Sequence, residues 1–254
     1  MPAAPAPAEG PPSTAAPAPG AGGGTDPATA PVLQARDLGR RFGRRWAFAR
    51  VDLDIRPGER LLLAGGNGSG KTTLLRVLST LLSPSRGTLA HFGGAPGADP
   101  TVARRQLALL SHAPGLYEDL SGIDNLRVFA RLLGAADPLP PLLERVGLDP
   151  ARAEPVRAWS AGMRKRLQIG LVLLQRPRLV LLDEPFSSLD PRGFDQLSAL
   201  IRELPGAVVL ASHQLGMAGA LCDRALLLDA GLPRWEGAAS DVGRAWKAVH
   251  GGSA

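Results

Sequence analysis

The sequence predicts an α/β fold, and three observations support it. A short apolar run, Arg60 to Ala64, leads into a glycine cluster and then into helical spacing from Leu74 to Leu82. A second apolar run, Leu179 to Leu182, ends in two acidic residues and has the composition of a buried parallel strand. Between these runs, residues 99–147 carry short helical patterns broken by prolines. This order predicts a parallel core sheet with an inserted helical part.

The chain is expected to begin with a disordered tail, residues 1–31. Pro, Ala and Gly fill 24 of these 31 positions, and only Glu9 and Asp26 are charged. Such a stretch buries too little apolar surface to offset its ordering entropy. We therefore expect one domain over residues 32–250, with the helical subdomain at about 97–176.

The other elements follow from local patterns along the domain. Three helices are predicted to open on a capping side chain, since a Ser or Asp precedes each helical run. These caps are Ser121, Ser160 and Asp190, with helices expected to reach about Leu133, Leu174 and Leu204. Short alternating or apolar runs predict strands at Val51–Ile55, Thr88–Phe92, Ala207–Ala211 and Ala225–Leu228.

Composition excludes several classes of protein. The chain has no apolar run of 18 residues, so no membrane span is expected, and its first residues do not have the pattern of a signal peptide. A lone cysteine, Cys222, excludes an internal disulfide and favours a reducing, cytoplasmic setting. The net charge is +6, but the arginines are spread out and not interleaved with aromatic residues. We therefore expect no nucleic-acid partner.

A glycine-rich loop between the first core strand and its helix is the strongest chemical signal. It matches the pattern G-x-x-x-x-G-K-[ST] in the strand–loop–helix context that this pattern needs. Glycines let backbone N–H groups turn toward phosphates, the lysine reaches the β- and γ-phosphates, and the first threonine offers a hydroxyl to Mg²⁺. A flexible Gly/Ser linker or a dinucleotide site explains the Lys-Thr pair less well. The residues are Gly65, Gly66, Asn67, Gly68, Ser69, Gly70, Lys71, Thr72 and Thr73.

Two acidic residues follow the second apolar run. Asp183 at the strand end is a candidate Mg²⁺ ligand, and Glu184 is placed to polarise a water for attack on a γ-phosphate. Alone, the pair could be a strand meeting a polar loop. Together with the phosphate-binding loop upstream, it predicts a nucleotide hydrolase.

Further segments narrow the class, because they resemble the motifs of ABC-type ATPases in order and spacing. Trp159 to Met163 resembles the signature motif, Ser188 to Asp190 the D-loop, and Ser212-His213 the switch histidine. Phe42 lies 29 residues before Lys71, where the family places an aromatic residue that stacks on adenine. The resemblance covers residues 32 to 250.

This resemblance implies an ABC-type P-loop ATPase with a RecA-like core sheet, an inserted helical subdomain and an N-terminal antiparallel β part. It implies a homodimer closed around two ATP molecules, in which Ser160 and Gly162 of one chain face the phosphate loop of the other. It also implies that Glu184 orients the water, His213 contacts the γ-phosphate and Asp190 communicates across the dimer. Thr72 and Asp183 would serve Mg²⁺.

Two departures from the family pattern stand out. The signature has lost its first glycine and its glutamine, while Ser160 and Gly162 remain, so we expect retained but slower turnover. The Q-loop glutamine is replaced, and His112 takes the aligned position. His112 could still donate or accept a hydrogen bond near Mg²⁺ or water, or it could simply pack or face solvent.

The segment around His112 resembles the ATPase subunit of bacterial haem exporters in cytochrome c maturation, as does Ser160 to Leu167. The resemblance implies a peripheral protein at the cytoplasmic face of the cell membrane, bound to integral permease subunits that are separate chains. Two alternatives stay open: a transport motor for another cargo, such as a drug or lipid, and a soluble ABC ATPase acting on ribosomes or nucleic acid.

Overall fold

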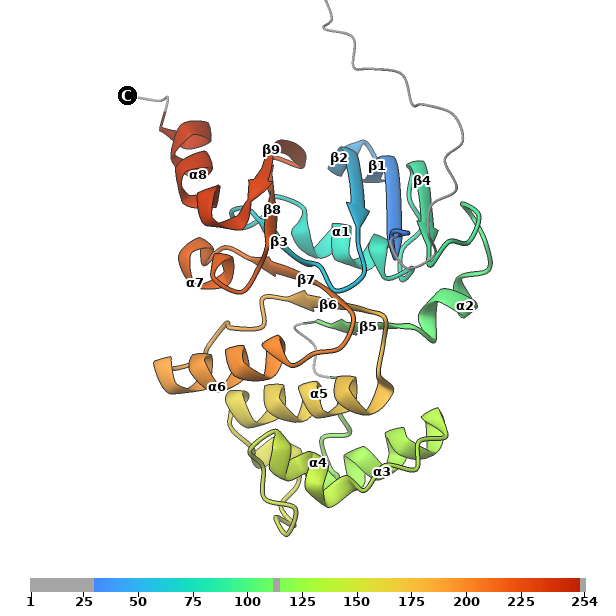
Figure 1. The fold of residues 1–254 in the computed structure, drawn as a ribbon, viewed down its shortest axis with the longest axis vertical. Helices are drawn as coiled ribbons and strands as arrows, with labels where there is room; N and C mark the ends of the chain where they lie inside the picture. The colour runs from blue at the N-terminus through green and yellow to red at the C-terminus, as the bar shows by residue number, and fades with distance from the viewer. Residues whose placement is uncertain (1–29, 112–114, 252–254) are drawn as a thin grey trace, which may run out of the picture.

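The computed structural model describes residues 30–111 and 115–251. Two sheets lie on either side of helix α1 (Lys71–Leu78), and the helices α5 (Ala161–Gln175) and α6 (Pro191–Arg202) cover the other face of the larger sheet (Figure 1). Helices α3 (Gly122–Leu133) and α4 (Leu139–Arg145) lie beyond α5, farthest from the smaller sheet (Figure 1).

The larger sheet has six strands in the order β5-β6-β7-β3-β8-β9. The first five are parallel, and β9 pairs antiparallel with β8 at one edge. The non-sequential order is typical of a crossover α/β sheet. The strands are β3 (Arg60–Ala64), β5 (Leu107–Leu110), β6 (Leu179–Asp183), β7 (Ala207–Ser212), β8 (Arg224–Asp229) and β9 (Leu232–Ala238).

The smaller sheet is antiparallel, in the order β2-β1-β4. It consists of β1 (Leu33–Phe42), β2 (Arg45–Ile55) and β4 (Arg86–His91). The pairing of β1 with β2 shifts register three times, and Asp37 of β1 has a positive φ of 46°. These irregularities bend the hairpin, which carries Phe42 next to its turn, where Phe42 pairs with Arg45.

The remaining helices fill the connections and the C-terminus. They are α2 (Pro100–Arg104), α7 (Leu215–Gly219), α8 (Val242–His250) and two 3₁₀ turns, Val156–Ala158 and Ala239–Asp241. Among residues 30–111 and 115–251, no helix has both the length and the apolar character needed to cross a membrane.

Alternating side chains of the core strands pack into two separate apolar cores, one on each face of the larger sheet. Leu61 and Leu63 face α1 and the small sheet, whereas Leu62 and Ala64 face the helices on the other side. Because successive strand side chains point to opposite faces, a sheet buried on both sides must be apolar at every position. This requirement explains the uninterrupted apolar run of β6, in which Leu179 to Asp183 are all buried.

The three predicted helix caps are confirmed. Ser121 Oγ accepts from Asp124 N at 3.2 Å, Ser160 Oγ from Met163 N at 3.2 Å, and Asp190 Oδ1 from Gly193 N at 2.8 Å. Each side chain satisfies a backbone N–H that the first helical turn leaves unpaired.

Two expectations need correction. Helix α1 ends at Leu78 and not at Leu82, because Thr80 takes a positive φ of 63° that an α-helix cannot hold. Residues 107–110 fall inside the range expected for the helical subdomain, yet they form β5 and pair in parallel with β6. Their apolar side chains complete the core sheet, so the helical insertion lies on the C-terminal side of β5.

Candidate functional site

The candidate site forms where three neighbouring strands of the core sheet end. Strands β6, β7 and β3 are adjacent, and all three run parallel. Their carboxyl ends therefore meet at one edge of the sheet (Figure 1), the position at which open α/β sheets bind ligands. The glycine-rich loop follows β3, Asp183 ends β6 and is followed by Glu184, and Ser212 ends β7 and is followed by His213.

Lys71 lies inside the glycine-rich loop. Its Nζ donates to Gly65 O at 2.8 Å and to Gly66 O at 2.9 Å, and the residue is only 6% exposed. Burial lowers the pKa of Lys71, while the nearby Glu184 and Asp183 carboxylates oppose that shift. Glu184 Oε1 is 3.7 Å from the ammonium. The loop therefore holds a positive charge next to a carboxylate, at the start of a helix.

Gly70 fixes how closely this loop approaches the small sheet. It precedes α1 with φ 103°, and a Cβ at this position would lie 2.4 Å from Ala47 O of β2. Only glycine adopts this conformation and allows this approach. The first N–H groups of α1 therefore lie at the glycine-rich loop. The N-terminus of a helix favours the binding of an anion at such a position.

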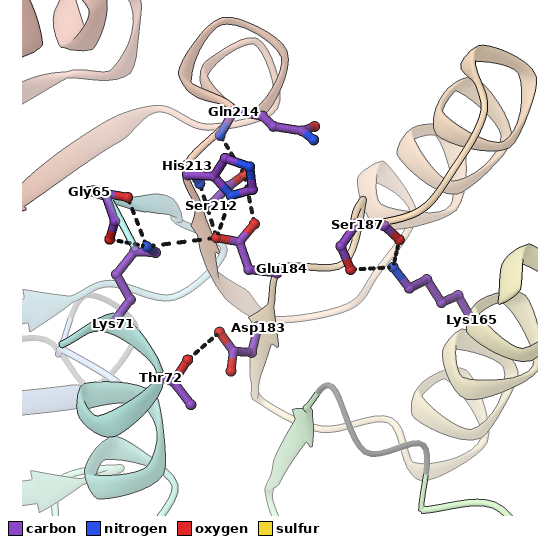
Figure 2. A network of polar contacts seen from close by, with 11 residues as sticks. Gly65, Lys71, Thr72, Lys165, Asp183, Glu184, Ser187, Ser212, His213 and Gln214 are labelled. Atoms are coloured by element: carbon purple, nitrogen blue, oxygen red, sulfur yellow. Dashed lines mark hydrogen bonds and ion pairs between the residues drawn. The ribbon is translucent and has the colours of Figure 1, made fainter. Parts of the chain in front are cut away.

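The acidic pair is held by two separate sets of contacts (Figure 2). Thr72 Oγ1 donates to Asp183 Oδ1 at 3.1 Å, and burial raises the pKa of Asp183. Glu184 Oε1 accepts from His213 N at 3.1 Å and lies 3.0 Å from His213 Nδ1. Ser212 Oγ donates to Glu184 Oε2 at 3.4 Å. These contacts to both oxygens therefore fix the orientation of the Glu184 carboxylate.

A cavity of about 550 Å³ opens over this edge of the sheet, within the usual size range of small-ligand sites. Its wall contains most of the predicted residues: Phe42, Asn67, Gly68, Ser69, Gly70, Lys71, Thr72, Thr73 and Glu184. The sequence reasoning missed five further lining residues: Arg45, Trp46, Ala47, Ala230 and Gly231. Phe42 and Trp46 are 52% and 42% exposed, so both rings present apolar surface to solvent.

Trp46 could have been found from the hairpin that carries Phe42. It lies two residues before the buried Phe48 in β2, and Arg41 pairs with it across the strands. Its ring lies 2.9 Å from where Gly39 would carry a Cβ, so the glycine makes room for it. The side of the cavity that carries Phe42 is therefore richer in aromatic surface than one predicted phenylalanine implies.

Three predicted residues lie elsewhere in the same chain. Ser160, Gly162 and Asp190 line a separate cavity of about 410 Å³ between the start of α5 and the start of α6. The described residues of one chain do not bring them to the phosphate-binding loop. His112 lies outside the described residues.

Comparison with known proteins decides the family. A family model described as ABC transporter matches residues 48–187. The chain belongs to this family. The fold is accordingly an ABC-type P-loop NTPase, as the sequence motifs predicted, and the chain is an ATP-hydrolysing subunit of an ABC transporter.

The relatives include a cytochrome c biogenesis export protein and a drug-resistance protein. The chain is 41% identical over 209 residues to the cytochrome c biogenesis ATP-binding export protein CcmA 2 of Cupriavidus metallidurans. That alignment covers 80% of this chain and 98% of the relative. The chain is also 38% identical to the daunorubicin resistance ATP-binding protein DrrA3 of Streptomyces coeruleorubidus, covering 80% of this chain and 67% of the relative.

Solved structures support the fold assignment. An ATP-binding subunit of an ABC transporter superposes with a TM-score of 0.75 at 29% identity, covering 85% of this chain and 93% of that one. A dimeric ATP-binding cassette, MJ0796, bound to ADP and Pi superposes with a TM-score of 0.71 at 21% identity, covering 82% and 98%. The second likeness shows the shared fold alone.

Proposed function

We propose that this chain is the ATPase motor of a haem exporter in cytochrome c maturation. The observation that carries the proposal is the extent of the similarity. Two CcmA proteins, of Cupriavidus metallidurans and Cupriavidus necator, align over 98% and 89% of their lengths at 41% and 39% identity. DrrA3 has a similar identity of 38%, but its alignment covers 67% of that protein. Export of a drug is therefore the second candidate.

The proposal includes the partners that such a motor needs. The permease would be one or more separate integral membrane chains, with this chain bound peripherally at the cytoplasmic face. Two copies would close around two ATP molecules. The MJ0796 structure, a post-hydrolysis state bound to ADP and Pi, is an example of a dimeric ATP-binding cassette. The separation of Ser160, Gly162 and Asp190 from the phosphate-binding loop supports this arrangement. A second chain can supply that face, which opens on the N-terminus of α5.

The contacts in the site support a separate role for each of its side chains in ATP hydrolysis. Lys71 and the N–H groups at the start of α1 would bind phosphate oxygens by charge and by hydrogen bonds. Glu184 would orient the attacking water and accept its proton, since its carboxylate is already held by Ser212 and His213. His213 is exposed and hydrogen-bonded to Glu184, so it could also reach the γ-phosphate. Phe42 would stack on adenine.

The residues present fit a bound Mg²⁺. Thr72 Oγ1 and Asp183 Oδ1 are 3.1 Å apart, and both are hard oxygen donors of the kind this ion prefers. When bound beside the nucleotide, the ion would neutralise charge on the phosphates. Within residues 30–111 and 115–251, no group of three His, Cys, Asp or Glu side chains gathers at a metal site. Two protein ligands suit an ion shared with phosphates and waters.

The test uses the substitution Glu184→Gln, with Glu154→Gln as the matched control. Glu154 is exposed and pairs with Arg152 far from the cavity. We expect E184Q to bind ATP and to form an ATP-dependent dimer in gel filtration. Its rate of ATP hydrolysis should be about one hundredth of the wild-type rate or lower. E154Q should behave as wild type. An E184Q protein with the wild-type rate would contradict the assignment of Glu184.

The cargo is tested with the same variant. E184Q and ATP in detergent-solubilised cells should co-purify membrane proteins of cytochrome c maturation, identified by mass spectrometry. Loss of the gene should abolish covalent haem staining of c-type cytochromes. A different permease, with haem staining intact, would keep the motor and reject the haem cargo. Ribosomes or nucleic acid without any membrane protein would reject the whole proposal.

A further inference from the structure

The loop between β6 and α6 has a strained backbone. Glu184 and Ser188 both have positive φ, 48° and 62°, although neither is glycine. Such a backbone is unfavourable for any residue other than glycine and persists only where the surroundings hold it. At its first residue the loop is tied to β7, because Glu184 N donates to Ala211 O at 3.0 Å. At Phe186 it is tied to α6, since the Phe186 and Phe194 rings lie 4.5 Å apart.

Between the two strained positions, the loop is tied to a different part of the molecule. Lys165 reaches from α5 to Ser187, where its Nζ donates to both the backbone oxygen and the hydroxyl, the latter at 3.1 Å. Figure 2 shows this side chain crossing from its helix to the loop that leads away from Glu184. The loop is thus held from the core sheet at one end and from α5 in the middle.

The charge of Lys165 suits this contact. The side chain is half-buried among Arg157, Arg164 and Glu118, in a cavity of about 410 Å³ that also reaches Glu184. Burial lowers its pKa to about 8, while the negative charge of Glu184 opposes that shift. At neutral pH the ammonium is therefore still mostly protonated, and it can donate to two oxygens at once.

Helix α5 links this contact to the helical part of the molecule. It packs against α3 and α4, the two helices that lie farthest from the small sheet (Figure 1). It begins at the Ser160 cap, little more than one turn before Lys165. Gly162 lies in that first turn, and a Cβ at Gly162 would be 3.5 Å from Leu189 Cδ2, near the end of the loop between β6 and α6. A displacement of α5 must therefore move Ser187 or break its contacts.

We propose that Lys165 is a positioning residue that sets the Glu184 carboxylate according to the position of α5. The inference rests on the catalytic role proposed above for Glu184. Ser187 is three residues from Glu184, and Ser187 N donates back to Glu184 O at 3.2 Å. The hold on Ser187 thus reaches the backbone of Glu184 through one hydrogen bond. Reactions that depend on an oriented group lose rate steeply when that group moves by about 1 Å.

The test compares Lys165→Met with Lys247→Met. Lys247 is an exposed helical lysine on α8, far from this loop. In the full-length protein we expect K165M to lower kcat for ATP about tenfold or more while KM changes less than twofold. K165R should recover part of kcat, because a guanidinium can still donate to Ser187. Ser187→Ala, which loses only the hydroxyl contact, should lower kcat less. K247M should match wild type.

A structural readout keeps the proposal testable apart from catalysis. Hydrogen–deuterium exchange of the peptide spanning 184–190 should become faster in K165M and stay unchanged in K247M. The Tm of K165M and of S187A shows whether either variant folds normally. Equal kcat for K165M and wild type, or unchanged exchange in that peptide, would overturn the inference. If E184Q hydrolyses ATP at the wild-type rate, the catalytic role proposed for Glu184 is wrong. If E184Q is impaired but K165M has the wild-type kcat, only the positioning role of Lys165 is wrong.

Discussion

Replacing Gly70 by alanine should destabilise the protein more than the same change at any open glycine. The new Cβ has two costs. A φ of 103° costs an L-residue about 1–2 kcal/mol. A contact of 2.4 Å to the Ala47 carbonyl adds about 1–3 kcal/mol, because a backbone oxygen of strand β2 cannot move aside as a flexible side chain can. The expected loss is therefore about 2–5 kcal/mol, a large part of a typical stability of about 5–15 kcal/mol.

Two other glycines separate these costs. Gly68 has φ 77° with no atom within 4 Å of the added Cβ, so G68A should show the backbone cost alone, about 1–2 kcal/mol. Gly243 lies in α8 with open space around it. There alanine should stabilise the protein by up to about 1 kcal/mol, because it is the better helix former.

Urea unfolding followed by circular dichroism measures all three variants. The expected order of midpoints is G243A above wild type, then G68A, then G70A, with unchanged slopes. A G70A midpoint equal to that of G68A would show that the loop does not press on β2. The close approach of Gly70 to Ala47 would then have no effect on stability.

The other expectations concern a thiol and a histidine. Burial raises the pKa of Cys222 from 9.0 to about 12, so iodoacetamide at pH 8 should label the folded protein about a thousandfold more slowly than the same chain in urea; equal rates would show an accessible thiolate. His91 donates from Nε2 to Leu78 O at 2.7 Å, and burial lowers its pKa below 6.5. Below that pH the unfolded chain binds a proton that the folded chain resists, so the free energy of unfolding should fall as pH drops through 6.5. His91→Gln should flatten that fall, and an unchanged slope would contradict the assignment.

Local chemistry made much of the fold predictable. Ser121, Ser160 and Asp190 act on backbone groups within three residues, so their helix caps could be placed from the sequence. The apolar run of β6 was also informative, since a strand buried on both faces must be apolar at nearly every position. Strand β9 was missed because its residues are half-exposed or exposed along its whole length, and a proline and a glycine interrupt it.

In the site, too, features set by contiguous residues could be predicted, whereas features set by tertiary packing could not. The glycine-rich loop and the acidic pair are contiguous in sequence, and each lies at a strand end where ligands bind. Trp46 and Lys165 act through contacts that depend on tertiary packing. Trp46 reaches the cavity through the bent hairpin, and Lys165 meets Ser187 across 22 positions of sequence. No local pattern marks Lys165, and Trp46 is indicated only by its place in the hairpin that carries Phe42.

The distance between the two cavities has a genetic consequence. If two copies pair as proposed, each ATP is enclosed by the phosphate-binding loop of one chain and the Ser160 face of the other. A chain that folds and pairs but cannot hydrolyse ATP would then disable its healthy partner. With equal amounts of both chains, about a quarter of random dimers would contain two healthy copies. An inactive allele of this gene would therefore interfere dominantly with the normal one.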